Sequence, residues 1–215
     1  SPAEWSVPSL QIRNCSLGLP VDGFRLLVSN DCLLDNSTLW LSRLDGQTNA
    51  PELRVDGNLT LTNGARLYLY AAATNALNPL YGAWLAVTGA LTISSNSWIY
   101  PFAHETNGGA PAFAVGGAVS IAAGGGIHAG YRGYGWGQGP GKSADNPWAA
   151  GSGYGGRGGV SGSGWDPGPA CGNTNPPLSA GSGGGSYQAA VYANPGGHGP
   201  PSTRRARSPA RRSGS

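Results

Sequence analysis

One apolar pattern of 16 residues occurs three times between Leu53 and His128, and it limits the folds open to this chain. The copies read LRVDGNLTLTNGARLY, LAVTGALTISSNSWIY and FAVGGAVSIAAGGGIH. Within each copy, apolar positions alternate with small or polar ones, which is the period of a strand with one buried face. A helix would need spacings of three and four residues. The pattern therefore predicts short strands.

The three copies agree in five apolar columns, all of which we expect to be buried. The columns are Leu53/Leu85/Phe113, Val55/Val87/Val115, Leu59/Leu91/Val119, Leu61/Ile93/Ile121 and Leu67/Ile99/Ile127. Between the apolar groups lie pairs and triplets rich in Gly and Asn, which tolerate the positive φ angles of tight corners. Three strands joined by two corners form one coil of a parallel β-solenoid, and stacked coils give each column a continuous core.

Antiparallel hairpins are the alternative explanation for Asp-Gly turns between alternating runs. A hairpin explanation predicts no identity of columns at fixed spacing, so we favour the solenoid and an all-β fold. Residues 1–128 are then solenoid coils, irregular over 12–50 and regular over 53–128. In the irregular part, Leu19, Val21 and Gly23 match a first strand and corner, and Leu39 and Leu41 indicate another coil. Atypical terminal repeats are expected in such folds.

Residues 129–199 form a glycine-rich segment with interspersed aromatic residues, which are too frequent for a plain flexible linker. We expect an ordered, irregular segment that packs on the coils through its rings. The same rings are candidates for self-association or ligand stacking: Tyr131, Tyr134, Trp136, Trp148, Tyr154 and Trp165. The connections after Leu69 and Pro101 add further aromatic residues, which either stack on a ligand or cover the flank of the solenoid.

The succession of β-coil, then Gly/aromatic runs, then GSGYGGRGG and GSGGG resembles the glycine-rich β-helical repeat regions of large secreted or cell-surface bacterial proteins, including autotransporter-type adhesins. The resemblance covers about residues 53–199. It implies a right-handed parallel β-helix and an extracellular setting, without a substrate or a catalytic residue. In the family pattern another coil follows GSGGG, whereas this chain continues into a basic tail.

Cysteine and asparagine residues carry further expectations about the compartment. Cys15 and Cys32 are 17 residues apart, which permits a local disulfide, and Cys171 is the odd cysteine. Three Asn-X-Ser/Thr motifs, at Asn14, Asn36 and Asn58, are candidate glycosylation sites, although such triplets are also common at β-corners. The chain has no Met and no apolar run long enough to span a bilayer, so we expect a secreted protein whose signal sequence was removed.

The tail at 200–215 contains five arginines, and without it the net charge changes from +3 to 3 − 5 = −2. Three interpretations stay open: a patch that binds polyanions, a solvated chain end, or a shifted reading frame. We give nucleic-acid binding the least weight.

Signals for catalysis are few. His104 and Glu105 are the one adjacent acid/base pair in a predicted loop, and they become candidates only if a cleft forms around them. The scattered Cys and His residues have no zinc-ligand spacing, and the glycine runs do not contain a phosphate-binding loop, so we expect no metal and no cofactor.

The sequence therefore favours an extracellular structural, adhesive or filament-forming surface protein over an enzyme. The alternative is a fragment of a β-helix that binds or degrades polysaccharide. A solenoid without end caps leaves backbone donors and acceptors free, so the expected partner is a second copy of the chain, or otherwise an extracellular polysaccharide.

Overall fold

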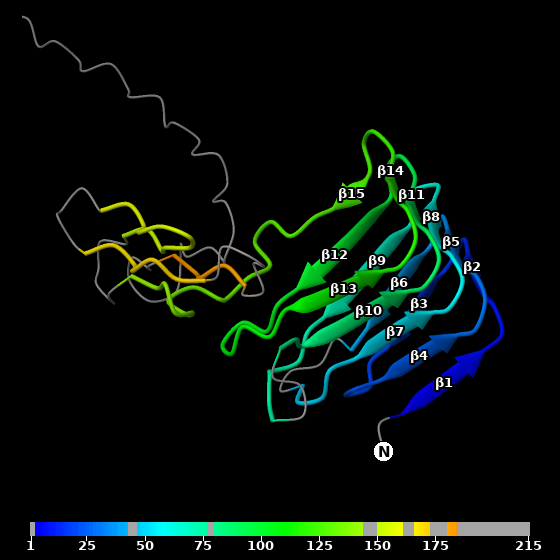
Figure 1. Cartoon of the computed structure of the whole chain (residues 1–215), viewed down its shortest axis with the longest axis horizontal. Helices are drawn as coiled ribbons and strands as arrows, with labels where there is room; N and C mark the ends of the chain where they lie inside the picture. The colour runs from blue at the N-terminus through cyan, green and yellow to red at the C-terminus, as the bar shows by residue number, and fades with distance from the viewer. Residues whose placement is uncertain are drawn as a thin grey trace, which may run out of the picture.

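The computed structural model describes residues 3–42, 47–76, 80–143, 150–160, 166–172 and 180–184. These residues contain strands and no helix, and the strands form three parallel five-stranded sheets (Figure 1). The chain passes through the sheets in rotation, so three successive strands make one rung of a β-solenoid, from rung 1 (β1–β3) to rung 5 (β13–β15). The predicted fold class is confirmed.

We name the sheets A, B and C in the order in which the chain meets them. Sheet A contains β1 (Glu4–Val7), β4 (Arg25–Val28), β7 (Glu52–Val55), β10 (Ala83–Val87) and β13 (Pro111–Val115). Sheet B contains β2 (Leu10–Arg13), β5 (Cys32–Asp35), β8 (Leu59–Thr62), β11 (Leu91–Ile93) and β14 (Val119–Ile121). Sheet C contains β3 (Ser16–Leu19), β6 (Thr38–Leu41), β9 (Arg66–Tyr70), β12 (Trp98–Phe102) and β15 (Gly126–Ile127).

Every predicted column is a line of paired residues in adjacent rungs. Leu53 pairs with Leu85 and Leu85 with Phe113, and the other four columns are aligned in the same way. Strands β7 and β10 run parallel, so the hairpin alternative is excluded. Every second side chain of a strand points into the centre, and in rungs 2 to 4 these side chains form a single apolar core together with Leu10 and Ile12 of rung 1.

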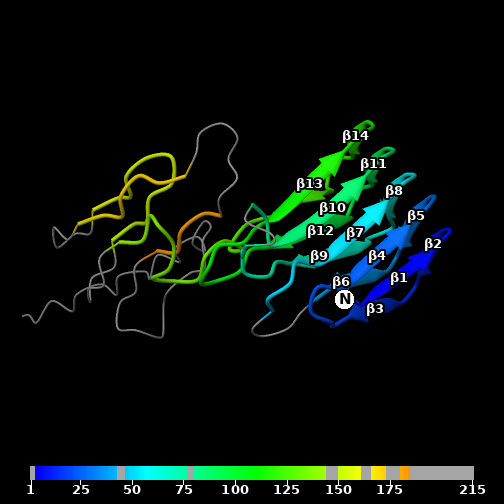
Figure 2. The ribbon, with the colours of Figure 1, turned by 60° about the horizontal axis from the view of Figure 1, so that its bottom comes forward.

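The prediction that all five columns are buried is wrong for the third copy. In rung 5, Val119, Ile121 and Ile127 are 54%, 47% and 43% exposed, although the residues paired with them in rung 4 are buried. The reason is position: rung 5 is the last rung of the stack, so nothing in the described part of the chain covers its inner side. Figure 2 shows β13 and β14 at one end of the stack and β1 and β2 at the other.

Two further copies of the repeat lie before Leu53, and the sequence prediction misplaced their strands. The first strand of rung 2 is β4 rather than Leu19 to Gly23: Leu19 ends β3, and Val21 is exposed in the connection. Strands also begin at Glu4, ahead of the expected irregular region. These coils were predicted as irregular because their corners are shorter, by two residues in all in rung 1 and by one in rung 2. The shorter corners break a fixed 16-residue spacing, while the strands still align in register.

Asparagine forms the corner between sheets B and C in four successive rungs. Asn14, Asn36, Asn63 and Asn96 have φ angles of 52°, 44°, 56° and 59°, and Gly124 occupies the corner of rung 5 with a φ of 79°. Asn is the side-chain-bearing residue best suited to this left-handed conformation. The amide of Asn36 also donates to Oδ1 of Asn14 over 2.8 Å, which links neighbouring corners.

The connection between β3 and β4 is joined to the segment before β7 through Asp22. Its carboxylate accepts hydrogen bonds from the backbone N–H groups of Thr48 and Asn49, both at 2.9 Å, and from their side chains. Burial acts to raise the pKa of Asp22, but these hydrogen bonds stabilise the carboxylate more, so the pKa lies below its ordinary value of 3.8.

We expect Asp22→Asn to lower the free energy of unfolding at neutral pH by about 1 kcal/mol, because amide oxygen replaces a charged acceptor at a partly exposed site. The lowered pKa means that the carboxylate stabilises the fold above about pH 4 and loses that effect as the pH falls through the folded-state value. Urea unfolding from pH 7 to pH 2 measures this. A variant as acid-sensitive as the native chain would contradict the assignment.

The glycine-rich segment contacts the solenoid beside the end of β12 and then extends away from the stack (Figure 1). The contact consists of backbone hydrogen bonds from Ala103 to Arg132 and from Gly135 to Glu105, together with side-chain contacts of Arg132 and Tyr134. Beyond it, glycine backbones bond to one another across the segment, as in Gly153 N–H to Gly141 and Gly168 N–H to Gly151.

Candidate functional site

The exposed face of rung 5 is the first candidate site, and we call it the open end. It consists of the free edges of β13, β14 and β15 and the inward side chains Phe113, Val115, Val119, Ile121 and Ile127. Each of these strands pairs with rung 4 on one side only, so one row of backbone N–H and C=O groups is left without a strand partner. The open end therefore combines apolar side chains with unpaired backbone groups.

Rung 1, at the opposite end of the stack, is better covered. Leu10 and Ile12 on β2 are buried, at 8% and 4% exposed, although no rung lies beyond them. Trp5 lies on the inward column of β1, opposite Leu26, and it is 40% exposed. The two ends thus differ in exposure: the inward side chains of β2 in rung 1 are buried, whereas those of β14 in rung 5 are about half exposed.

A hollow at the sheet A edge is lined by Ala86, Val87, Thr88, Phe113, Ala114, Val115 and Gly116. None of these side chains ionises in the physiological range. The hollow therefore contains no group that could act as a general acid or base, and its chemistry is that of an apolar contact surface.

The outer face of sheet C carries the second candidate site, a stack of four aromatic rings. Tyr68 stacks on Tyr100 at 4.7 Å between ring centroids, and Tyr70 stacks on Phe102 at 4.5 Å. The neighbouring rings of one strand, Tyr68 and Tyr70, are 6.5 Å apart and almost parallel, at 11°. The centroid distances between rungs match the spacing of adjacent strands, at which rings that lay flat on the sheet would overlap. The ring planes are therefore roughly perpendicular to the axis of the stack. Their edges therefore point to solvent.

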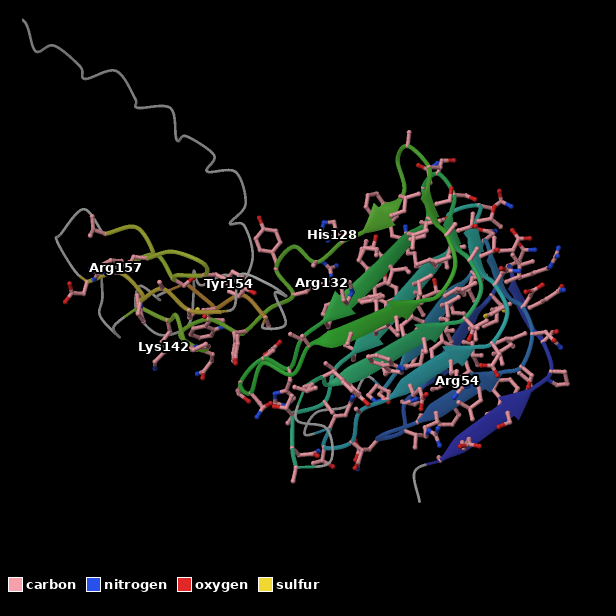
Figure 3. All side chains as sticks on the ribbon, viewed as in Figure 1. Arg54, His128, Arg132, Lys142, Tyr154 and Arg157 are labelled. Atoms are coloured by element: carbon pink, nitrogen blue, oxygen red, sulfur yellow. The ribbon has the colours of Figure 1, made fainter. Side chains whose placement is uncertain are left out.

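Arg132 closes this stack on the side of rung 5, and Figure 3 shows its side chain next to β12. Its guanidinium carbon lies 4.7 Å from the ring centroid of Tyr100 and 4.6 Å from that of Phe102, within the range of cation–π contacts. One terminal nitrogen donates to the carbonyl of Gly130 at 2.7 Å and lies 2.8 Å from Nδ1 of His128. Because Arg has no acceptor, a hydrogen bond between these two groups runs from the guanidinium to Nδ1 of His128.

The arrangement of the stack bears on the binding of sugars. A sugar ring stacks on the face of an aromatic ring, but here Tyr68, Tyr70, Tyr100 and Phe102 pair face to face, and Arg132 lies over two of them. All four side chains are half-buried. The rings thus stabilise contacts between rungs, in agreement with the interpretation that aromatic residues near Leu69 and Pro101 cover the flank of the solenoid.

The aromatic stack was not predicted as a site, although the sequence carried a signal for it. The last position of each 16-residue copy is Tyr68, Tyr100 or His128, and each follows an inward apolar residue. An aromatic column on the outside of a strand is visible at that position once the copies are aligned. Tyr70 and Phe102 were assigned to connections, whereas they end β9 and β12.

The predicted catalytic pair, His104 and Glu105, lies in the connection between β12 and β13. Nδ1 of His104 accepts from the backbone N–H of Asn107 at 3.2 Å, and the His104 backbone also bonds within the same loop. The backbone carbonyl of Glu105 accepts from Gly135, and its side chain is exposed. Through these bonds the pair belongs to the connection that contacts the glycine-rich segment, and its catalytic role stays a prediction.

The predicted Cys15–Cys32 disulfide is absent, and both residues are free thiols. Cys32 faces the core on β5 and pairs with Leu10, whereas Cys15 is exposed at the corner beyond the end of β2. The three-residue rise from Leu10 to Arg13 alone spans about 10 Å, which is further than the span of a disulfide. The sequence spacing of the two cysteines gave no indication that one is buried in the core and the other is exposed.

We expect alkylation of the native protein with iodoacetamide to modify Cys15 and to leave Cys32 intact. Burial raises the pKa of the Cys32 thiol to about 12, so both its access and its thiolate fraction are low at pH 8. Mass spectrometry of peptides before and after unfolding in urea provides the readout, and the unfolded chain serves as the control in which both react. Equal modification of both thiols in the native state would contradict the placement of Cys32.

The predicted sequons lie at corners of the solenoid. Asn14 and Asn36 belong to the asparagine corner between sheets B and C. Asn58 precedes β8, where its Oδ1 accepts from the N–H of Ala90 and its Nδ2 donates to Asp31. These structural roles account for asparagine at all three positions, and glycosylation stays a prediction.

The predicted ring cluster of the glycine-rich segment is only partly within the described residues. Tyr134 packs against Gly108 and Gly139 and donates to the carbonyl of Asn107. Trp136 and Tyr154 are exposed, and Tyr131 adopts a positive φ of 58°. The remaining two members, Trp148 and Trp165, lie outside the described residues, as does the arginine-rich tail at 200–215.

Within the described ranges, no cluster of His, Cys, Asp and Glu could hold a metal ion. The same part of the chain contains no helix of the length and apolar character required to cross a membrane. Comparisons with known proteins give no match: no protein-family model matches the chain, and neither the curated proteins nor the solved structures provide a significant match.

Proposed function

We propose that this protein is an extracellular structural protein that forms filaments, a matrix or an adhesive surface through association of its solenoid. The observation that carries the proposal is the open end. Exposed parallel edges with apolar side chains are an established route to association between chains. The apolar columns that are buried in rungs 2 to 4 are exposed or only partly buried in rung 5.

The extracellular setting rests on the sequence. The order of β-coils, Gly/aromatic runs and the GSGYGGRGG and GSGGG motifs resembles glycine-rich β-helical regions of autotransporter-type adhesins. The structure adds support for the coil part of that resemblance, because residues between Glu4 and Ile127 form one continuous parallel stack. From this resemblance we infer a role at the cell surface or in an extracellular matrix.

A polysaccharide-binding or polysaccharide-degrading β-helix is the alternative, and the aromatic stack on sheet C is the feature that favours it. Two facts give it less support. One face of each ring lies against another ring, and Arg132 lies over Tyr100 and Phe102. The hollow at the sheet A edge is lined by side chains that do not ionise.

Electron microscopy and sedimentation of the purified chain over a range of concentrations test the proposal. We expect oligomers that grow with protein concentration and regular filaments or sheets at high concentration. A protein that stays monomeric and monodisperse at high concentration would be incompatible with a role through assembly. A pull-down with insoluble polysaccharides tests the alternative, and the variant Tyr100→Ala then shows whether sheet C carries the binding.

A further inference from the structure

We propose that the open end of one chain docks on rung 1 of a second copy, so that β13, β14 and β15 pair in parallel with β1, β2 and β3 of that copy. This inference rests on the proposed function and specifies the surfaces, the direction and the register of assembly. The partner is identical to the chain itself, and the contact is heterologous, so it propagates into a filament or closes into a ring.

The two surfaces have the same cross-section because sheets A, B and C continue unbroken from rung 1 to rung 5. The outer edges of β1–β3 and of β13–β15 are the two ends of the same three sheets, and each end carries a row of backbone groups without a strand partner. Continued stacking would therefore pair all three sheets at once, with the parallel geometry already present between neighbouring rungs.

The inward side chains also match when the register of the columns is continued. Column by column, Phe113 would meet Trp5, Val119 would meet Leu10, Ile121 would meet Ile12 and Ile127 would meet Leu17. Each contact is apolar, and it covers Val119, Ile121 and Ile127 of rung 5. Leu10 and Ile12 are already buried in the single chain, so on β2 and β14 the newly buried apolar area lies mainly on the rung 5 side. Trp5, which is 40% exposed, would be covered at the same time.

Corner length does not prevent the contact. Rung 1 has only Pro8 and Ser9 between β1 and β2, whereas rung 5 has Gly116, Gly117 and Ala118 between β13 and β14. Within the chain, rung 1 already stacks on rung 2, whose corresponding corner also has three residues, and the strands on either side keep their register. A one-residue difference in this corner is therefore compatible with stacking of rung 1 on rung 2, and the same difference would occur between rung 5 and rung 1 of the docked copy.

The outward side chains carry no like charges across the junction. Rung 5 presents Ala112, Ala114 and Ser120 on sheets A and B. On rung 1, Glu4 is paired with Arg25 at 2.9 Å, and Arg13 lies 3.5 Å from Asp35. Ionic repulsion between the docked ends is therefore small.

A symmetric contact between two open ends is the competing arrangement. A two-fold axis would bring the strands together antiparallel, and it would superpose one sheet on its counterpart while the other two sheets exchange places. In head-to-tail stacking, sheets A, B and C of one copy instead pair with sheets A, B and C of the next. The direction of the contact can be determined with cysteine pairs.

Cysteine cross-linking tests the register. Ser120 on β14 and Gln11 on β2 would be direct partners, and Cα atoms of adjacent strands are within the span of a disulfide. In a full-length background with Cys15→Ser and Cys171→Ser, we expect the double variant Ser120→Cys/Gln11→Cys to give a ladder of dimers and higher oligomers after mild oxidation. Ser120→Cys alone and the off-register pair Ala114→Cys/Gln11→Cys should remain monomeric on a non-reducing gel.

The outcomes separate this inference from the proposed function. Dimers of Ser120→Cys alone would show a symmetric contact between two open ends, which overturns the head-to-tail inference. Filaments in the microscope without a ladder would mean that assembly uses another surface, which overturns the inference and leaves the proposed function standing. Absence of both the ladder and any concentration-dependent oligomer overturns both.

A charge at the open end gives an independent readout. Ile121→Asp places a carboxylate in the apolar contact, and we expect association to weaken by about 100-fold or more. Val160→Asp, at an exposed site in the glycine-rich segment, is the matched control and should associate like the native chain. Circular dichroism confirms that both variants are folded. Native-like association of a folded Ile121→Asp variant would overturn the inference.

Discussion

Replacing Leu91 with alanine should lower the free energy of unfolding by about 2 to 5 kcal/mol, the range for truncation of a buried leucine. Leu91 on β11 is fully buried between Leu59 in the preceding rung and Val119 in the following one. Truncation leaves a cavity in a column that cannot collapse, because the backbone hydrogen bonds of sheet B fix the spacing of the strands. Urea unfolding followed by circular dichroism measures the change, at a protein concentration low enough to keep the chain monomeric.

The matched control is Val119→Ala, in the same column one rung later. Val119 is 54% exposed, so its truncation removes little buried area, and we expect a loss below about 1 kcal/mol. If both variants lose the same stability, Val119 is buried in the monomer in solution, and rung 5 cannot be an open end. At high protein concentration the two effects should converge, because docking of a second copy would bury Val119.

The strands of rungs 3 to 5 could be predicted from the sequence because the same inward residue recurs at one spacing. Leu53, Leu85 and Phe113 need no knowledge of the structure to be aligned. The strands of rungs 1 and 2 could be predicted only as irregular coils, because the corner between sheets B and C has fewer residues there and a shorter corner shifts every later position of the repeat. In a solenoid the strands fix the register in space, whereas corners absorb changes in length.

The candidate sites were harder to predict because they depend on which rung is last. Val119 and Leu91 have the same environment in the sequence pattern, and only the end of the stack makes one of them exposed. The disulfide prediction failed for a related reason: Cys32 occupies an inward position of β5, which the misplaced second copy concealed. The aromatic sites were predicted in connections, whereas the observed stack is formed by outward positions of β9 and β12 that neighbour an inward apolar column.

Replacing Gly168 with alanine should open the glycine-rich segment without unfolding the solenoid. A Cβ atom on Gly168 would collide with the backbone carbonyl of Gly141, and rigid backbone cannot move aside as a flexible side chain can. The N–H of Gly168 donates to Gly151 at 2.9 Å, and its carbonyl accepts from Gly158 at 3.0 Å, so displacement of this residue breaks both links. The cost of such overpacking is typically about 1 to 3 kcal/mol.

Amide hydrogen exchange resolves the two parts of the molecule. A local loss of this size corresponds to exchange that is about 5 to 150 times faster, and we expect it for peptides covering 150–160 and 166–172. Peptides from β7 to β11 should exchange as in the native chain, because the contacts between the described part of the segment and the solenoid lie beside the end of β12.

Gly159→Ala is the matched control for this experiment. Its Cβ would meet no other atom within 4 Å, although the residue belongs to the same segment and its carbonyl accepts from Gly151. Alanine there adds a side chain without a collision, so protection should persist. Of the two substituted positions, Gly168 is the one at which a Cβ would meet another backbone. Equal loss of protection in both variants would therefore show that close contact between glycine backbones does not hold the segment together.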